Sequence, residues 1–456
     1  MPGRMSTDEG VDTATHAIPD TARAGRFSLT MSWWGVCSAL FYIFLGASLS
    51  VAYGSVNTII AMVLSVITYG LINGVLSRYA IKTGLSVALI SRVLFGKVGA
   101  LVATAIFSLT AMYYAIFEGS VIATAANKVT GLSYFVAAVI VVVYSVPLVL
   151  GSVQNFLDKL NGVLLPFYLL GLGAAVTFTI VKYGWSGDWA TFVPKGGAPS
   201  WGWLHAYVGY MGVWVLMMFT VDFARFGARK HAGYHRWFNF GMPFYLVTLL
   251  LSGLVGIFLI NAGGVATVSE TGVVDQLIVV LGGVPALLFI WVTQTRINSA
   301  NYYLATVNMQ AFFDRAARIK LAKGIWAVVV GTVVLVMMSL TDVFSYLLLA
   351  LNYQGIFVTA WVAVAMVHIL SGTYKRLVGD EVDHDRVPAV NPAGLGAWVV
   401  GAGLGLVMTL TGFGADWAPL ATVVISAGLY AALLPRARSQ WFTTSTLEPA
   451  VQPTVV

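Results

Sequence analysis

The stretch "TQTRINSANYY", Thr293 to Tyr303, carries a glutamine, an arginine and two asparagines within a long apolar part of the chain. A charge at the bilayer centre costs roughly 2.5 to 3.5 kcal/mol on insertion-based scales, so such side chains usually face other protein or a water-filled site. A helix of this composition therefore belongs inside a bundle of membrane-spanning helices. It is also the first candidate for a functional site.

The composition indicates the same fold class. The 456 residues are 59% hydrophobic and 9% charged, whereas soluble domains carry about 25% charged residues. Because a span needs about 20 mostly apolar residues, the sequence predicts an all-α polytopic membrane protein with twelve transmembrane helices. They are expected at residues 29–53, 56–77, 98–125, 133–152, 161–182, 202–222, 240–262, 277–306, 323–340, 343–370, 393–412 and 416–434.

The basic residues predict the orientation. Of the 25 Lys and Arg residues, three lie in predicted outer segments and Arg296 lies within a helix, which leaves 21 in the inner segments. The positive-inside rule then places both termini in the cytoplasm, as expected for a multi-pass protein of the cell membrane. Topology accounts for the net charge of +7, so the charge does not indicate a nucleic-acid partner, which would require a clustered basic footprint on a soluble domain.

Two predicted helices contain glycines where a transporter would interrupt a span. The first reads "FLGASLSVAYG" (44–54) with Gly46, and the sixth reads "YVGYMGVW" (207–214) with Gly209 and Gly212. Inverted-repeat transporters unwind such helices at the bilayer midplane to expose backbone groups to substrate and ion. Glycine also permits close helix packing, and the glycines alone favour packing.

Glu118 is an acidic residue well inside a predicted helix. It follows Tyr114 at a spacing of four, so the two side chains share one helix face. The ring could stack on a flat heterocycle while the carboxyl group meets its polar edge; the alternative is a buried pair with a neighbouring helix. Tyr210 and Trp214 repeat this spacing beside the sixth-helix glycines, where aromatic residues serve either stacking or packing.

The stretch around Arg296 presents two separate faces. At about 100° per residue, Gln294, Asn298 and Asn301 fall on one stripe, while Arg296 lies about 140° from Asn301. Amides offer both donors and acceptors to the edge of a heterocycle. Alternatively they hydrogen-bond between helices, which is worth about 0.6 kcal/mol on average. We expect Asn298 and Asn301 to contact a ligand.

Several functional classes receive no support from the sequence. The single cysteine, Cys37, has no partner for a disulfide or a metal site. Metal-binding spacings, a P-loop and a nucleophile with a nearby base are likewise not apparent. The sequence therefore predicts no metal, no cofactor and no enzymatic activity.

Several motifs together resemble the nucleobase:cation symporters, a family that includes cytosine, purine, uracil, allantoin and hydantoin permeases. The most specific is "KTGLSVALISRVLFG" (82–96), which is similar to the family's loop after the second helix, and the residues that follow it align without gaps to the cytosine permease pattern. "DFARF" (222–226) and "NSANYY" (298–303) resemble elements of the sixth and eighth helices. The similarity covers residues 26–435.

The resemblance implies a five-plus-five inverted repeat with broken helices 1 and 6, plus two accessory helices. The implied segments are a disordered cytoplasmic N-terminal tail (1–26), a transmembrane domain (27–435) made of a first repeat (27–182), a second repeat (202–370) and accessory helices (393–435), and a cytoplasmic C-terminal tail (436–456).

The resemblance also implies roles for single residues. Tyr114 takes the position of a substrate-stacking Trp, Glu118 that of a substrate-binding Gln, and Asn301 that of a substrate-binding Asn. Trp214 lies nearest to the stacking aromatic of the sixth helix. The expected substrate-binding residues are Tyr114, Glu118, Tyr210, Trp214, Gln294, Asn298 and Asn301.

The implied cation site departs from the sodium-coupled pattern. There, small hydroxyl residues just before the eighth-helix Asn bind the ion together with first-helix carbonyls; here Thr295 and Arg296 hold those positions, with Ser38 and Ala39 on the first-helix side. A guanidinium keeps its proton in practice and so could occupy the place of the cation. We therefore expect proton coupling, with Glu118 as the carrier, in preference to sodium coupling.

The sequence thus predicts a secondary transporter in the lipid bilayer that imports a nucleobase or related N-heterocycle together with a proton or sodium ion. A carrier for another small cationic or zwitterionic compound, such as a vitamin or amino-acid derivative, is the alternative, because Glu118 could pair with a positive charge. A channel or receptor is a further alternative. The oligomeric state stays open.

Overall fold

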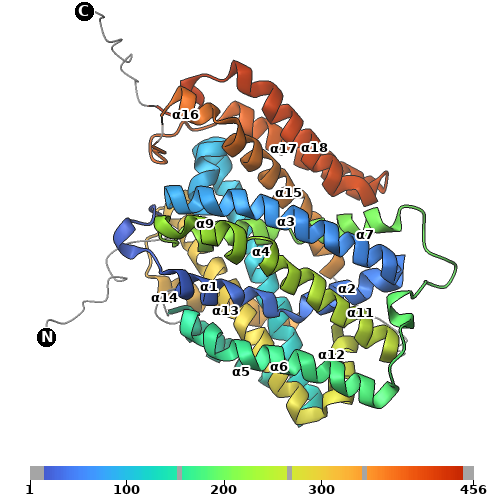
Figure 1. The fold of residues 1–456 in the computed structure, drawn as a ribbon. Helices are drawn as coiled ribbons and strands as arrows, with labels where there is room; N and C mark the ends of the chain where they lie inside the picture. Colours follow the sequence, from blue (N-terminus) through green and yellow to red (C-terminus); the bar gives the residue numbers. More distant parts are fainter. Residues whose placement is uncertain (1–14, 151–156, 264–269, 341–346, 380, 445–456) are drawn as a thin grey trace, which may run out of the picture.

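The computed structural model describes residues 15–150, 157–263, 270–340, 347–379 and 381–444. Within these ranges the chain forms packed helices, and Figure 1 shows them as a bundle. Eight helices are long and apolar enough to cross a membrane, or up to ten spans are present if each of two bent helix pairs counts as one. The all-α membrane fold is therefore confirmed, while the number twelve stays a prediction.

The first span is broken near its middle. It consists of α1 (Arg26–Trp34), a 3-10 turn (Val36–Ser38) and α2 (Leu40–Tyr53). The two halves meet at 42°, and Ala39 at the break has a φ of −59° and a ψ of 129°, outside the helical region. Gly46 lies inside α2 instead, where an added Cβ would come within 2.5 Å of the backbone of a neighbouring helix. Close packing is therefore the confirmed interpretation of Gly46.

A second broken span lies in the other half of the chain. It consists of α7 (Gly202–Met211) and α8 (Val215–Ala224), again bent by 42°. Residues 212–214 form the turn between them, so an interruption at Gly212 is confirmed. Gly209 lies within α7, where an added Cβ would meet a leucine side chain of α2 at 3.0 Å. Here one glycine marks the break and the other permits packing.

The remaining long helices follow the expected order, with shifted boundaries. They are α3 (Ser55–Thr83), α4 (Val87–Thr130), α5 (Tyr134–Leu150), α6 (Asp158–Tyr183), α10 (Met242–Tyr245) continuing through a π-helical segment (Leu246–Leu251) into α11 (Ser252–Gly263), α12 (Glu270–Leu281), α13 (Gly283–Ala316), α14 (Lys323–Leu340), α15 (Leu347–Ser371), α17 (Pro392–Thr411) and α18 (Ala418–Leu433).

Two predicted helix boundaries are wrong. The helix expected at 98–125 begins at Val87 and bends at Gly96, whose φ is +80°. An added Cβ on Gly96 would lie 2.6 Å from the Cα atom of Val390, so this glycine allows the segment before α17 to cross the kink. The helix expected at 277–306 is divided at Gly282, where φ is +84°, into α12 and α13. Positive φ strongly favours glycine, which explains both sites.

The first residues described by the structure are ordered. Residues 15–25, which the sequence assigns to a disordered tail, cross the ends of several helices at the side of the bundle where the basic residues gather. Ile18 N–H donates to the Gly84 carbonyl at 2.9 Å, and Ala24 N–H donates to the Phe226 carbonyl at 2.6 Å. This segment is therefore part of the folded domain.

The centre of the bundle is formed by α4 and α13, which pack along each other, with α5 and α14 beside them. α2 packs against α11, and α3 packs against α7 and α8. Near the C-terminus, α17 and α18 lie together against α15 at one edge of the bundle (Figure 1). Both broken spans therefore sit next to the α4–α13 pair.

Candidate functional site

A small cavity lies where the two broken spans meet α4 and α13. Its empty volume is about 280 Å³. Most of its walls are apolar or aromatic, with a carboxyl group and an amide among them. The lining residues are Ala39, Phe41, Tyr42, Tyr114, Glu118, Val213, Val215, Leu216, Phe219, Ile297 and Asn301.

Four residues singled out in the sequence thus meet at one cavity. Tyr114 and Glu118 come from α4 and Asn301 from α13, and Ala39 is the residue at the first break. The second break contributes Val213 from its turn. Helix breaks beside a cavity give a ligand access to backbone groups that a continuous helix would use internally.

The Glu118 side chain is connected to the first break. It is 1% exposed, and its carboxylate accepts a hydrogen bond from Nε2 of Gln294. Oε1 of the same glutamine accepts a hydrogen bond from Leu40 N–H at 3.1 Å. Leu40 begins α2, and the first N–H groups of a helix have no partner within it. Gln294 therefore joins the carboxyl group of the cavity to the start of a half-helix.

Tyr114 is held by contacts at its ring and at its hydroxyl. Its ring lies edge-to-face with Phe41, with centroids 6.0 Å apart and planes at 82°. Its hydroxyl accepts a hydrogen bond from Nε2 of Gln354 at 2.8 Å. The cavity therefore has a positioned aromatic wall beside the Glu118 carboxyl group, which is the pairing that the i, i+4 spacing predicts.

The three amides of the α13 stripe have different surroundings. Asn301 lines the cavity, and its Nδ2 donates to Oδ1 of Asn298 at 3.4 Å. Asn298 lies outside the lining and donates from Nδ2 to the Ala115 carbonyl at 3.4 Å. Gln294 also lies outside the lining, between Glu118 and the first break. Asn301 therefore lines the cavity, whereas Gln294 and Asn298 hydrogen-bond to the lining residues Glu118 and Asn301.

Arg296 lies at the first break, away from the cavity. Its side chain is fully buried, its Nη2 donates to the Trp34 carbonyl at 2.7 Å, and its guanidinium lies 5.6 Å from the ring centroid of Tyr168. Trp34 is the last residue of α1, and the final carbonyls of a helix are unsatisfied and carry partial negative charge. A positive group is therefore favoured at this position.

Ser38 and Thr295, which were also expected at the cation site, make hydrogen bonds to neighbouring segments. Ser38 Oγ donates to the Thr293 carbonyl at 3.0 Å and to the Gly35 carbonyl at 2.8 Å. The Thr295 hydroxyl is hydrogen-bonded to the Tyr144 hydroxyl at 2.9 Å, on the α5 side of α13. Ser38 and Arg296 therefore lie at the break, whereas Thr295 contacts a different helix.

Tyr210 and Trp214 are buried, and neither lines the cavity. The Tyr210 carbonyl accepts a hydrogen bond from the Tyr69 hydroxyl at 2.5 Å, and Trp214 lies in the turn of the second break. A direct contact of either ring with a ligand stays a prediction.

Four further residues at or beside the cavity were not predicted from the sequence. Phe41, Tyr42 and Phe219 line the cavity, and Gln354 positions Tyr114. Gln354 had a usable signal, since it is an amide within the long apolar helix α15. The three aromatic residues gave no such signal, because 13% of this chain is aromatic and the spacing of those rings matches ordinary packing.

Asp222 joins three helices at the basic end of the bundle. Its carboxylate accepts hydrogen bonds from Val87 N–H at 2.7 Å and from Nδ2 of Asn308 at 3.1 Å. Val87 begins α4, so the carboxylate meets the positive end of a helix dipole. Arg225 Nε donates to the Asp222 backbone carbonyl at 3.2 Å. The residue thus connects α8 with α4 and α13, at a distance from the cavity.

The sequence was compared with known protein families, and residues 17–428 match the family described as "Permease for cytosine/purines, uracil, thiamine, allantoin". No curated protein matches the sequence.

Solved structures of transporters share the fold. The chain is similar to Mhp1, a nucleobase-cation-symport-1 family transporter, in a closed conformation with bromovinylhydantoin bound: the TM-score is 0.71 at 16% identity, covering 93% of this chain and 94% of that chain. The inward-facing conformation of Mhp1 gives a TM-score of 0.73 at 15% identity and 93% coverage of both chains. MhsT in complex with L-phenylalanine gives 0.61 at 14% identity, covering 89% of this chain and 99% of that chain.

These structural neighbours are transporters, and the match to the family extends over nearly the whole chain. The chain is therefore a multi-pass membrane transporter of the secondary type, and it belongs to the nucleobase-cation symporter family, the permeases for cytosine/purines, uracil, thiamine and allantoin.

Proposed function

We propose that this protein imports a nucleobase or a related N-heterocycle, of the cytosine, purine, uracil, allantoin or hydantoin class, by proton symport with alternating access. The observation that carries the proposal is the meeting of Tyr114, Glu118 and Asn301 at one cavity between two helix breaks. In its membrane the protein would have both termini in the cytoplasm, as the distribution of basic residues predicts.

The chemistry of the cavity suits a flat, polar-edged ring. Aromatic side chains cover much of its wall, and offset or edge-to-face contacts between rings are favourable. The Glu118 carboxyl group and the Asn301 amide supply acceptor and donor atoms in a plane that a heterocycle can match. A site built to hydrogen-bond such an edge rejects analogues that lack it, because its buried polar groups are then left unpaired.

Arg296 supports proton coupling over sodium coupling. Its guanidinium already places a positive charge at the carbonyl end of α1, next to the first break. A sodium ion at the same carbonyls would be repelled by a buried cation that cannot release its proton. Glu118 is then the titratable group at the cavity that can carry the coupled charge, and Gln294 connects it to the break.

A second candidate substrate class is a small cationic heterocycle. A buried carboxylate in an apolar cavity favours a positively charged partner, and the family description includes thiamine beside the neutral bases. Such a substrate would pair with Glu118 directly and would compete with a proton for it. The same cavity would serve, so the substrate screen decides between the two.

The test of the site is a thermal-shift screen of the purified protein against cytosine, uracil, hypoxanthine, adenine, allantoin, hydantoin and thiamine. We expect one of the neutral heterocycles to stabilise the protein, and Glu118→Gln and Asn301→Ala to lose that stabilisation. Asp222→Asn is the matched control for a carboxyl-to-amide change outside the cavity. Full retention of affinity in both cavity variants would remove this site.

The test of coupling is uptake into proteoliposomes. Labelled substrate should accumulate under an imposed inward proton gradient without sodium, and internal unlabelled substrate should accelerate uptake by exchange, as a carrier requires. Uptake that depends on sodium and ignores the pH gradient would contradict proton coupling. Flux without exchange acceleration would favour a channel.

A further inference from the structure

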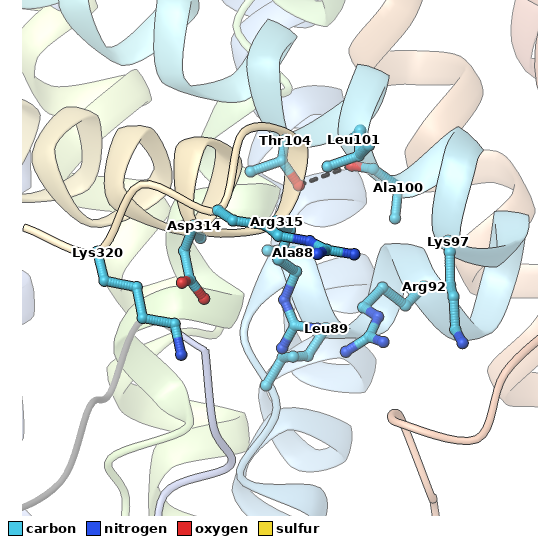
Figure 2. Close-up of a pocket in the computed structure, with 12 residues that line it drawn as sticks. Ala88, Leu89, Arg92, Lys97, Ala100, Leu101, Thr104, Asp314, Arg315 and Lys320 are labelled. Carbon is cyan, nitrogen blue, oxygen red and sulfur yellow. Dashed lines mark hydrogen bonds between the residues drawn. The ribbon is translucent and has the colours of Figure 1, made fainter.

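A second and much larger pocket lies at the basic end of the bundle, between α4 and the end of α13. Its empty volume is about 1170 Å³. Five cationic side chains and one carboxylate line it: Arg92, Lys97, Asp314, Arg315, Arg318 and Lys320. Figure 2 shows Arg92, Lys97, Asp314, Arg315 and Lys320 around this pocket, on the two helices and on the segment that follows α13.

The charge of this pocket is only partly balanced. Arg92 Nη1 lies 2.9 Å from Oδ1 of Asp385, and Arg315 Nη1 lies 3.9 Å from the same oxygen. Among the described residues, no ion pair engages Lys97, Arg318 or Lys320. Five cations against two carboxylates leave a net charge of +3 around the pocket.

The backbone after α13 turns sharply to bring two of these cations to the pocket. Arg318 has a φ of +58°, in the left-handed region that residues with a side chain seldom adopt. Ile319 N–H donates back to the Phe313 carbonyl at 3.1 Å, which holds the turn. Arg318 and Lys320 therefore reach the pocket from a segment that would otherwise lead directly to α14.

Apolar side chains from α4 and α13 also line the pocket, alongside the cations. The apolar lining residues are Ala88, Leu89, Ala100, Leu101 and Ala311. The neighbouring Val98 and Val102 are 54% and 48% exposed, as expected for side chains that face acyl chains. The pocket thus combines cations with apolar lining residues, next to exposed apolar side chains of α4.

We propose that this pocket binds the phosphate headgroup of an anionic phospholipid from the leaflet at the basic end of the bundle. Basic pockets between transmembrane helices suit such headgroups, and guanidinium groups pair with phosphate oxygens in a bidentate manner. A soluble phosphate would use the cations alone, whereas a phospholipid also accounts for the apolar lining residues. The lipid would connect α4 to the end of α13, independently of the substrate cavity.

The experiment is native mass spectrometry of the protein carrying cardiolipin or phosphatidylglycerol, with phosphatidylcholine as the neutral reference. Arg318→Gln/Lys320→Gln removes two pocket cations at the surface. Arg78→Gln/Arg438→Gln is the matched control, because it removes two exposed cations outside the pocket. Each cation near an anionic lipid surface is worth about a fivefold change in binding, so we expect affinity for the anionic lipid to fall about 25-fold in the pocket variant.

The outcomes separate the sources of the bound phosphate. Loss of anionic lipid in the pocket variant alone, with phosphatidylcholine unaffected, supports the proposal. Equal loss in both double variants would show diffuse attraction and overturn it. If inorganic phosphate at millimolar concentration stabilises the protein in phosphatidylcholine nanodiscs, and only the pocket variant loses this effect while still binding anionic lipid, the pocket is a soluble-anion site and the lipid assignment is wrong.

Discussion

Replacing Arg296 with methionine separates a structural role of this buried charge from a role in transport. The guanidinium makes one charge-assisted hydrogen bond, to the Trp34 carbonyl, and lies over the ring of Tyr168. Methionine has a similar length and can fill the space without a charge. We expect the variant to fold with nearly unchanged stability and to lose substrate accumulation.

The magnitude follows from the contacts of the guanidinium. The hydrogen bond contributes about 1.5 to 3 kcal/mol and the ring contact about 0.5 to 2 kcal/mol. Against these, Nε and Nη1 have no hydrogen-bond partner among the described residues, which costs about 1 to 3 kcal/mol for each. The two sides cancel, so the net change on substitution should lie within about 2 kcal/mol of zero.

The assay is a thermal melt in detergent beside uptake per folded molecule in proteoliposomes. Arg225→Met is the comparison, since it removes another fully buried arginine, one that lies against Asp222. The Arg225 guanidinium donates a hydrogen bond to the Asp222 backbone carbonyl, and a hydrogen bond from a charged group contributes about 1.5 to 3 kcal/mol, so this variant should melt below the wild type. A large drop in the melting temperature of Arg296→Met with normal uptake would show that the charge is structural and would refute the reasoning.

Three further substitutions test other parts of the structure. Glu118→Gln should weaken substrate binding about 10- to 150-fold, because a charged acceptor contributes about 1.5 to 3 kcal/mol, and uptake should no longer follow an imposed pH gradient; unchanged uptake at every pH would contradict this. Asp222→Asn should lower the melting temperature, because it weakens the bonds to Val87 and Asn308, while calorimetry should give a substrate affinity within about twofold of wild type; a large loss of affinity would place Asp222 in the site. Gly256→Ala should destabilise the fold, since its Cβ would lie 1.9 Å from the Ile43 carbonyl oxygen, whereas Gly173→Ala has open space and should melt like the wild type.

The sequence predicted the helices well because hydropathy over 20 residues reports burial in lipid directly. It also predicted that Tyr114 and Glu118 lie together at the cavity, because a spacing of four on a continuous helix fixes their common face.

Neither hydropathy nor helix spacing could predict where the first span breaks. The break runs from Gly35, which caps α1, to Ala39, and a single glycine and an alanine in an apolar stretch do not by themselves mark a break. Gly46 suggested a helix break, but it serves close packing. In a sequence, a glycine that interrupts a helix cannot be told from one that permits close packing. The separate roles of the three amides could not be predicted from the sequence either. Spacing shows which helix face they share, but the partner of each amide depends on how α2 and α4 pack against that face.

The arrangement on α13 explains why one helix carries so much polarity. Asn301 reaches the cavity, Gln294 joins the cavity carboxyl group to the start of α2, and Arg296 binds the end of α1. The two halves of the first broken span are thus held from one rigid helix by two different polar groups. Under the proposed proton coupling, a change in the protonation of Glu118 would alter its bond to Gln294 and therefore the bond from Gln294 to α2, whereas the fixed charge of Arg296 would hold the end of α1. Substrate and proton can then act on the same break, which is the physical requirement for coupling two ligands through one conformational change.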